Sequence, residues 1–233
     1  DKAESRGLGD VYKRQMQALH ASGYNGRVNG IACLAENMPG SGSYRPGDVF
    51  KTYSGKTVEV YSTDAEGRNV LADGLWKAGE FDPEYIVDLA TLTGAIVVAL
   101  GNQITGMWSN DELLAERLER SAKACGEPMW RMPLNDQFRR YMTDTPFADI
   151  RNGSSGGRAG SSNGAAAFLE FFVPTRNYEE DADKLPWVHL DIAGTAWGPG
   201  SKAGTERENP FFKHGTSGVH VRTLYHLITQ NHE

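Results

Sequence analysis

The sequence has few cysteines, no long apolar run and no excess of positive charge, and each absence excludes a class of protein. The two cysteines, Cys33 and Cys125, lie far apart, which excludes a disulfide framework and a zinc site built from cysteine pairs. No stretch reaches the roughly 18 apolar residues of a membrane-spanning helix. The formal net charge of −6 is spread along the chain, so neither nucleic acid nor an anionic membrane is an expected partner.

The chain also starts without the apolar segment of a secretory signal peptide. Together with the low cysteine content, this favours a reducing, cytoplasmic location. Asn152-Gly-Ser is formally a glycosylation sequon, but without a secretory signal we interpret it as a turn. A length of 233 residues with 39% hydrophobic residues predicts one globular domain with a substantial core.

Strand-like and helix-like segments alternate along the chain. Apolar or alternating residues predict strands within 27–35, 56–62, 85–95 and 187–194. Helical spacing predicts helices over 68–78, 111–125, 165–173 and 217–230, and the end of another before Gly23. This order predicts an α/β fold with a mixed, largely parallel central sheet and helices on both faces. In such folds ligands bind where the carboxyl ends of the strands meet.

Acidic residues follow one predicted strand directly, in Thr63-Asp64-Ala65-Glu66. Thr-x-x-Glu is a helix capping box, and acids in a first turn suit the positive end of the helix dipole. Alternatively, two carboxylates at a strand end can bind hard divalent cations, with Glu66 bridging two ions and Asp64 binding one. Arg68 heads a helix face expected to be buried, so it needs an anionic partner and can hold a bound anion or stabilise an oxyanion.

Two more acids, Asp88 and Asp191, lie inside apolar strands. A buried carboxylate must be paired or hydrogen-bonded. Each either accepts hydrogen bonds from nearby backbone and threonine groups or supports an adjoining site. The residues alone leave both interpretations open.

A serine hydrolase is the rival interpretation. Gly160-Ser-Ser162-Asn-Gly164 matches Gly-x-Ser-x-Gly, and Asp191 followed by His214 or His220 gives the order Ser, Asp, His. A nucleophile elbow needs a strand leading directly into the serine. The sequence predicts no such strand before Ser162, which makes this alternative the weaker one.

Four segments together resemble the leucyl (cytosol) aminopeptidase family of two-metal exopeptidases. They are "NMPGSGSYRPGD", "TVEVYSTDAEGR", "DLATLTGA" and "HLDIAGTAW". The resemblance extends from about Met16 to the C-terminus, and Asp-Ala-Glu-Gly-Arg is its most specific part. It implies release of N-terminal residues, often leucine, from peptides with a free N-terminus, by a homo-oligomer that is a hexamer in the family.

The resemblance also implies roles for individual residues. Asp64 and Glu66 would bind two divalent cations, manganese or zinc, with Glu66 as the bridge. Arg68 would be the catalytic arginine, which either holds a bicarbonate ion that acts as the base or stabilises the transition state. Contacts with the substrate, or the lining of its pocket, would come from Thr91, Leu92, Gly94 and Ala193.

The sequence departs from the family pattern in its first part. The Lys and two Asp that complete the family's metal sites, and its second Lys, have no counterpart upstream of Asp64. Residues 1–15 lack family character and predict a foreign segment, followed by a partial catalytic domain at 16–233. Ser62 stands where the family usually has Asn. We therefore expect weakened metal affinity and activity, and a non-catalytic assembly module is the third alternative.

Overall fold

The fold is that of a computed structural model, described here over residues 8–179, 181–197 and 216–230. The chain forms two compact units. Unit 1 comprises residues 1–30, 89–131 and 188–233, and unit 2 comprises residues 31–88 and 132–187. The chain passes between them within two strands, β3 (Ile86–Ala90) and β7 (Trp187–Asp191).

Most of a four-stranded sheet lies in unit 1, in the order β3-β7-β4-β5. Strands β4 (Thr105–Ser109) and β5 (Met129–Arg131) are parallel, whereas β4 and β7 are antiparallel. The Ile86 N–H donates to the Pro186 carbonyl at 2.9 Å and the Ile192 N–H to the Ala90 carbonyl at 2.8 Å, so β3 and β7 run in the same direction. The predicted α/β fold with a mixed, largely parallel sheet is confirmed.

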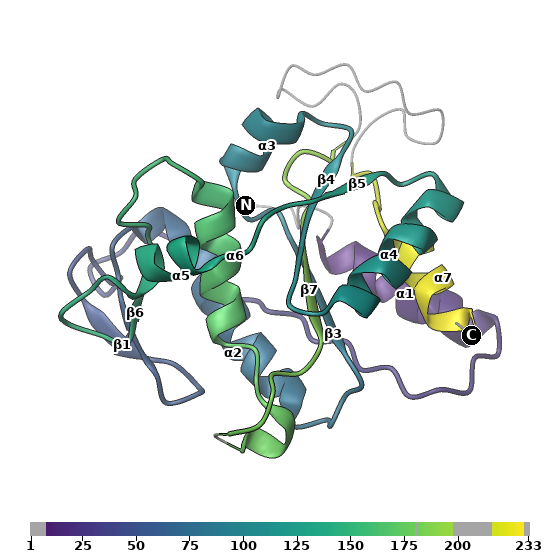
Figure 1. Ribbon diagram of the computed structural model, residues 1–233, viewed down its shortest axis with the longest axis horizontal. Helices are drawn as coiled ribbons and strands as arrows, with labels where there is room; N and C mark the ends of the chain where they lie inside the picture. The colour runs from purple at the N-terminus through teal and green to yellow at the C-terminus, as the bar shows by residue number, and fades with distance from the viewer. Residues whose placement is uncertain (1–7, 180, 198–215, 231–233) are drawn as a thin grey trace. The chain divides into compact units, whose positions relative to one another are not determined.

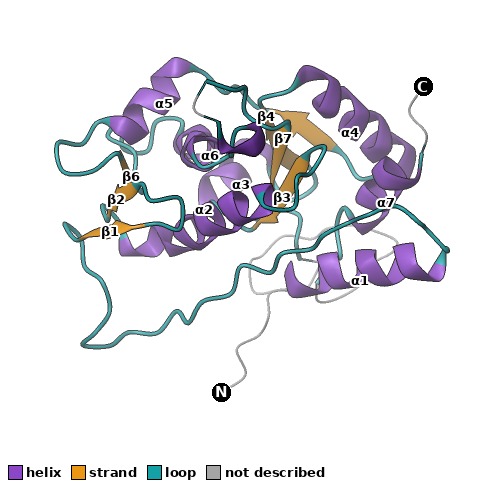
Figure 2. Cartoon of the chain, turned by 90° about the horizontal axis from the view of Figure 1, so that it is seen from below, coloured by secondary structure: helices purple, strands orange, loops and turns teal. Residues whose placement is uncertain are grey.

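Four helices accompany this sheet in the described part of unit 1: α1 (Leu8–Ala21), α3 (Gly94–Leu100), α4 (Glu112–Cys125) and α7 (Val221–Thr229). Helix α7 packs against both α4 and α1, as Figures 1 and 2 show. Helix α4 begins where the Asp111 side chain accepts the Leu114 N–H at 2.7 Å, and it ends at Gly126, whose φ is 65°. It buries an apolar stripe formed by Leu114, Ala115, Leu118 and Ala122.

A smaller sheet in unit 2 has the order β1-β2-β6, with strands β1 (Val49–Lys51), β2 (Thr57–Glu59) and β6 (Ile150–Arg151), which Figure 2 shows side by side. Strand β2 is antiparallel to β1 and parallel to β6. Helix α6 (Ser161–Phe171) packs against α2 (Glu66–Gly79) and α5 (Asp136–Thr143). Two 3-10 turns complete the unit, η1 (Thr63–Ala65) and η2 (Arg176–Tyr178).

The strand predicted within 27–35 is wrong, because this segment has no regular secondary structure. A strand is stabilised by a hydrogen-bonded neighbour and by a buried face. Neither sheet of the described chain includes this segment, and its large side chains Ile31 and Leu34 are exposed, by 37% and 81%. No described helix is both long and apolar enough to cross a membrane.

Candidate active site

The acidic junction between β2 and α2 lies in unit 2. Thr63 to Ala65 form the 3-10 turn η1, and α2 begins at Glu66 with Ala65 as its N-cap. The predicted capping box is therefore wrong, because the extra turn places Thr63 ahead of the N-cap position and no side chain caps either helix. The Asp64 side chain is exposed and that of Glu66 is half-buried. Both acids lie in a first turn, where they suit the helix dipole, and the metal-binding interpretation stays a prediction.

A loop residue from the first resembling segment contacts this junction. The Asn37 Nδ2 donates to Glu66 Oε1 at 2.9 Å. An ionised carboxylate only accepts hydrogen bonds, so the contact also fixes which end of the Asn37 amide faces it. Each carboxylate oxygen has two lone pairs, so Oε1 can hold this hydrogen bond and a cation together.

Arg68 lies in the first turn of α2 and is half-buried. Its predicted helix face is confirmed, since Ala72 and Leu75 on the same side are 0% and 3% exposed. Its Nη1 donates to the main-chain carbonyl of Asn152 at 2.7 Å. This hydrogen bond orients the guanidinium, and the predicted anionic partner of Arg68 stays a prediction.

Unit 1 contains the four residues predicted to contact the substrate. The backbone N–H groups of Leu92 and Ala193 each donate to Asp191 Oδ1 at 3.1 Å, and the Thr93 hydroxyl donates to Oδ2 at 2.6 Å. Asp191 is 1% exposed, and its burial raises the pKa of the carboxyl. One carboxylate thus joins the two predicted substrate segments, which confirms that Asp191 accepts hydrogen bonds from backbone and threonine groups.

The other two predicted substrate residues lie beside these contacts. Thr91 directly follows β3 and is half-buried, whereas Gly94 is exposed as the first residue of α3. Thr93 caps this helix, since its hydroxyl accepts the Ile96 N–H at 3.2 Å. A carbon added at Gly194 would lie 2.3 Å from the Gly101 carbonyl oxygen, so only glycine fits there.

Asp88 has a different partner from Asp191. Its Oδ2 accepts the indole N–H of Trp187 at 2.7 Å, and both residues are buried. The sequence offered backbone or threonine donors for this acid and missed the indole, which lies 99 residues away in the chain. The contact joins the adjacent strands β3 and β7, and a supporting role of Asp88 beside a site stays a prediction.

The described residues contain no group of three or more His, Cys, Asp or Glu side chains that could hold a metal ion. The two carboxylates at the β2–α2 junction offer the hard oxygen atoms that magnesium, manganese and zinc accept. They therefore fit a divalent cation by chemistry, as two ligands of a larger set.

The serine-hydrolase alternative lacks its required geometry. Ser162 is 6% exposed in the first turn of α6, and residues 155–160 before it form turns instead of a strand. His220 is 0% exposed, and its Nε2 lies 2.8 Å from the Thr105 hydroxyl. His214 lies outside the described residues. A buried serine without a strand before it does not form a nucleophile elbow.

These features define an α/β protein with paired acids and an arginine at a strand-to-helix junction. The family model for the cytosol aminopeptidase family, catalytic domain, matches residues 3–225. The chain belongs to this family, which confirms the resemblance found in the sequence. The match includes part of residues 1–15, and the predicted division at residue 15 stays a prediction.

Curated relatives are similar over nearly the whole chain. The probable cytosol aminopeptidase of Afipia carboxidovorans is 46% identical over 220 residues, which are 94% of this chain and 40% of that protein. The probable cytosol aminopeptidase of Chelativorans sp. is 45% identical over 219 residues, with the same shares. That of Cenarchaeum symbiosum is 46% identical over 199 residues, 84% of this chain and 38% of the relative. The chain thus spans about two fifths of the length of these relatives.

Proposed function

We propose that the chain contributes the carboxylate ligands and the arginine of a metal-dependent aminopeptidase site, which releases N-terminal residues, leucine among them, from peptides. Membership of the cytosol aminopeptidase family supports this activity. The observation that carries the assignment is the β2–α2 junction, where Asp64 and Glu66 precede Arg68 and where no side chain caps α2.

In this proposal Asp64 and Glu66 would hold two divalent cations, manganese or zinc. When bound, such ions polarise a scissile carbonyl and lower the pKa of a water molecule. Such ions would also bind the free amine of a peptide N-terminus, and this requirement for a free amine accounts for exopeptidase action. The Asn37 amide keeps Glu66 in one orientation.

Arg68 supplies positive charge for the anionic species of the reaction. Its guanidinium either stabilises the developing oxyanion or holds a bicarbonate ion that accepts a proton. The hydrogen bond to the Asn152 carbonyl supports both roles, because it holds the guanidinium in one position.

Four residues of unit 1 would bind the N-terminal residue of the peptide. Asp191 takes the N–H groups of Leu92 and Ala193, which fixes both backbone segments without exposing the acid. Thr91 directly follows β3 and Gly94 begins α3, so they lie on either side of Leu92 and Thr93 in the chain. The family resemblance adds a cytoplasmic homo-oligomer, a hexamer, to the proposal.

Leucine release from a leucyl amide with added Mn²⁺ or Zn²⁺ tests the proposal. We expect slow turnover, because the described residues supply two carboxylates and two ligands seldom hold two ions. Glu66→Ala should abolish this turnover, whereas Glu116→Ala, which removes an exposed carboxylate from α4, should leave it unchanged. Equal turnover in both variants, or none in the folded unmodified chain, would contradict the proposal.

A further inference from the structure

Asn152 lies directly after β6 and is 0% exposed. Its Oδ1 accepts the backbone N–H groups of Tyr61 at 2.8 Å and Ser62 at 3.0 Å, and its Nδ2 donates to the Ser62 carbonyl at 2.9 Å. Its own N–H donates to the Glu59 carbonyl at 3.0 Å, and its carbonyl accepts Arg68 Nη1 at 2.7 Å. Both ends of its amide and both of its backbone groups therefore bind the segment from β2 to α2.

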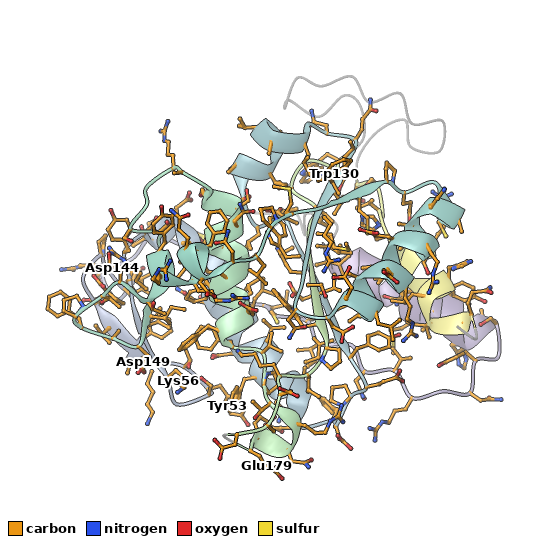
Figure 3. All side chains as sticks on the ribbon, in the orientation of Figure 1. Tyr53, Lys56, Trp130, Asp144, Asp149 and Glu179 are labelled. Carbon is orange, nitrogen blue, oxygen red and sulfur yellow. The ribbon has the colours of Figure 1, made fainter. Side chains whose placement is uncertain are left out.

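The strand pairing before Asn152 sets its position along that segment. Strand β6 is parallel to β2, with Ile150 opposite Val58. The Asp149 carboxylate accepts both the N–H and the hydroxyl of Thr57 at 2.8 Å, and these hydrogen bonds lower the pKa of Asp149. Figure 3 shows Asp149 beside Lys56, at the start of β2. With this register fixed, Asn152 lies opposite the residues that follow β2.

The residue after Asn152 also serves this contact. A carbon added at Gly153 would lie 2.3 Å from the Tyr61 ring, so glycine lets Tyr61 approach closely. The predicted turn at Asn152-Gly-Ser is correct as a bend of the chain, but the asparagine side chain is buried and bonded through Nδ2. In the folded chain this nitrogen is closed to modification.

We propose that Asn152 is a positioning residue of the candidate site. It holds the backbone at Tyr61 and Ser62, from which Asp64 and Glu66 extend, and it anchors Arg68 through an uncharged oxygen. The inference rests on the proposed function, because it assumes that the fixed backbone at Tyr61 and Ser62 serves cation binding by Asp64 and Glu66. A neutral amide suits the role, since its donor and acceptor match two backbone N–H groups and one carbonyl without adding charge beside the carboxylates.

Two substitutions test the role. Asn152→Ala removes all three side-chain hydrogen bonds. Asn152→Asp keeps the acceptor for the two N–H groups but turns a second oxygen toward the Ser62 carbonyl. Asn135→Ala is the matched control, because the Asn135 side chain also accepts two backbone N–H groups, those of Gln137 and Phe138, as the N-cap of α5 in the same unit.

The measurements are amide hydrogen exchange without metal and calorimetric Mn²⁺ affinity, at a temperature where each variant is folded. We expect Asn152→Ala to speed exchange at Tyr61 and Ser62 at least tenfold and to lower Mn²⁺ affinity about tenfold, the size of effect seen when supporting contacts of metal ligands are lost. Asn152→Asp should lower the affinity while largely protecting the two amides. Asn135→Ala should lower the melting temperature alone.

The outcomes separate this inference from the proposed function. Glu66-dependent Mn²⁺ binding that both folded Asn152 variants retain would overturn the inference and leave the proposed function intact. If the unmodified chain shows no Glu66-dependent Mn²⁺ binding, the proposed function fails, and amide hydrogen exchange in Asn152→Ala alone tests the positioning role. Unchanged exchange at Tyr61 and Ser62 would overturn that role. Faster exchange confined to residues 61–68 would support it. If Asn152→Ala does not fold, Asn152→Ser, whose shorter side chain cannot make all three hydrogen bonds, replaces it under the same criteria.

Discussion

Asp191 offers a sharp test of the structure, because alanine and asparagine at this position should have very different effects. The carboxylate accepts the N–H groups of Leu92 and Ala193 on one oxygen and the Thr93 hydroxyl on the other. Asp191→Ala removes every one of these acceptors. Asp191→Asn keeps the oxygen that takes both N–H groups and places an NH₂ group toward the Thr93 oxygen, which can accept it.

The expected magnitudes follow from these contacts. A buried donor left without a partner costs about 1–3 kcal/mol. Four donors lose their acceptor in Asp191→Ala, since the Thr93 backbone N–H also bonds to this carboxylate. Removal of a buried charge and rotation of the Thr93 hydroxyl offset part of the loss, so we expect destabilisation by about 3 kcal/mol. Asp191→Asn should cost less than about 1 kcal/mol. A gap of about 2 kcal/mol corresponds to roughly 4–8 °C in melting temperature for a chain of this size.

Urea unfolding at pH 7, followed by tryptophan fluorescence and circular dichroism, measures this gap as a difference in midpoint at equal slope. Equal destabilisation by the two substitutions would refute the hydrogen-bond account of Asp191. A more stable alanine variant would show that the buried charge outweighs its hydrogen bonds.

The same residue makes stability depend on pH. Burial raises the pKa of Asp191 above its ordinary value of 3.8, so the folded chain keeps a proton that the unfolded chain releases. Its contribution to stability is therefore full below about pH 4 and falls as the pH rises through the raised pKa. The unmodified chain should gain stability relative to Asp191→Asn as the pH is lowered through this window. A difference that stays constant or shrinks toward acid pH would contradict the raised pKa.

Three further substitutions test the site and its supports. Asn37→Ala should weaken Mn²⁺ binding about tenfold in calorimetry, because the amide no longer holds Glu66; unchanged affinity would argue against this contact. Gly194→Ala should destabilise the chain by more than about 2 kcal/mol, since its Cβ would lie 2.3 Å from the Gly101 carbonyl oxygen. A melting temperature within about 2 °C of that of the unmodified chain, which corresponds to roughly 1 kcal/mol, would refute this. In Gly94→Ala the added Cβ has no atom within 4 Å, so the substitution should stabilise α3 by up to about 1 kcal/mol. It should nevertheless lower the rate of leucine release, and an unchanged rate would contradict the role of Gly94 in the substrate pocket.

Local patterns predicted those elements whose stability is itself local. Helix α4 was predictable because its apolar stripe and its Asp111 cap lie within one run of residues. The β2–α2 junction was predictable for the same reason, since a strand pattern, three ionisable residues and a helix pattern adjoin. The strand predicted at 27–35 failed because a strand forms only with a partner, and the segment itself does not encode one.

The contacts that position the site could not be predicted from the sequence. Asn152 holds residues some 90 positions earlier, and Asp191 accepts from Leu92 across 99 positions. Such pairs depend on how strands are ordered in the sheets, which periodicity does not reveal. The capping box at Thr63 failed for a subtler reason: one additional 3-10 turn moved the cap by two residues to Ala65, and this choice lies within the usual uncertainty of helix starts.

Calorimetric titration with Mn²⁺ is the most direct test of the central claim, that the acids at the β2–α2 junction bind a divalent cation. The unmodified chain is compared with Glu66→Gln, which keeps the size of the side chain and removes its charge, and with Glu116→Gln on the exposed face of α4. We predict weak binding that Glu66→Gln abolishes and Glu116→Gln preserves. Identical titrations for all three proteins would contradict the assignment of the junction as a metal site.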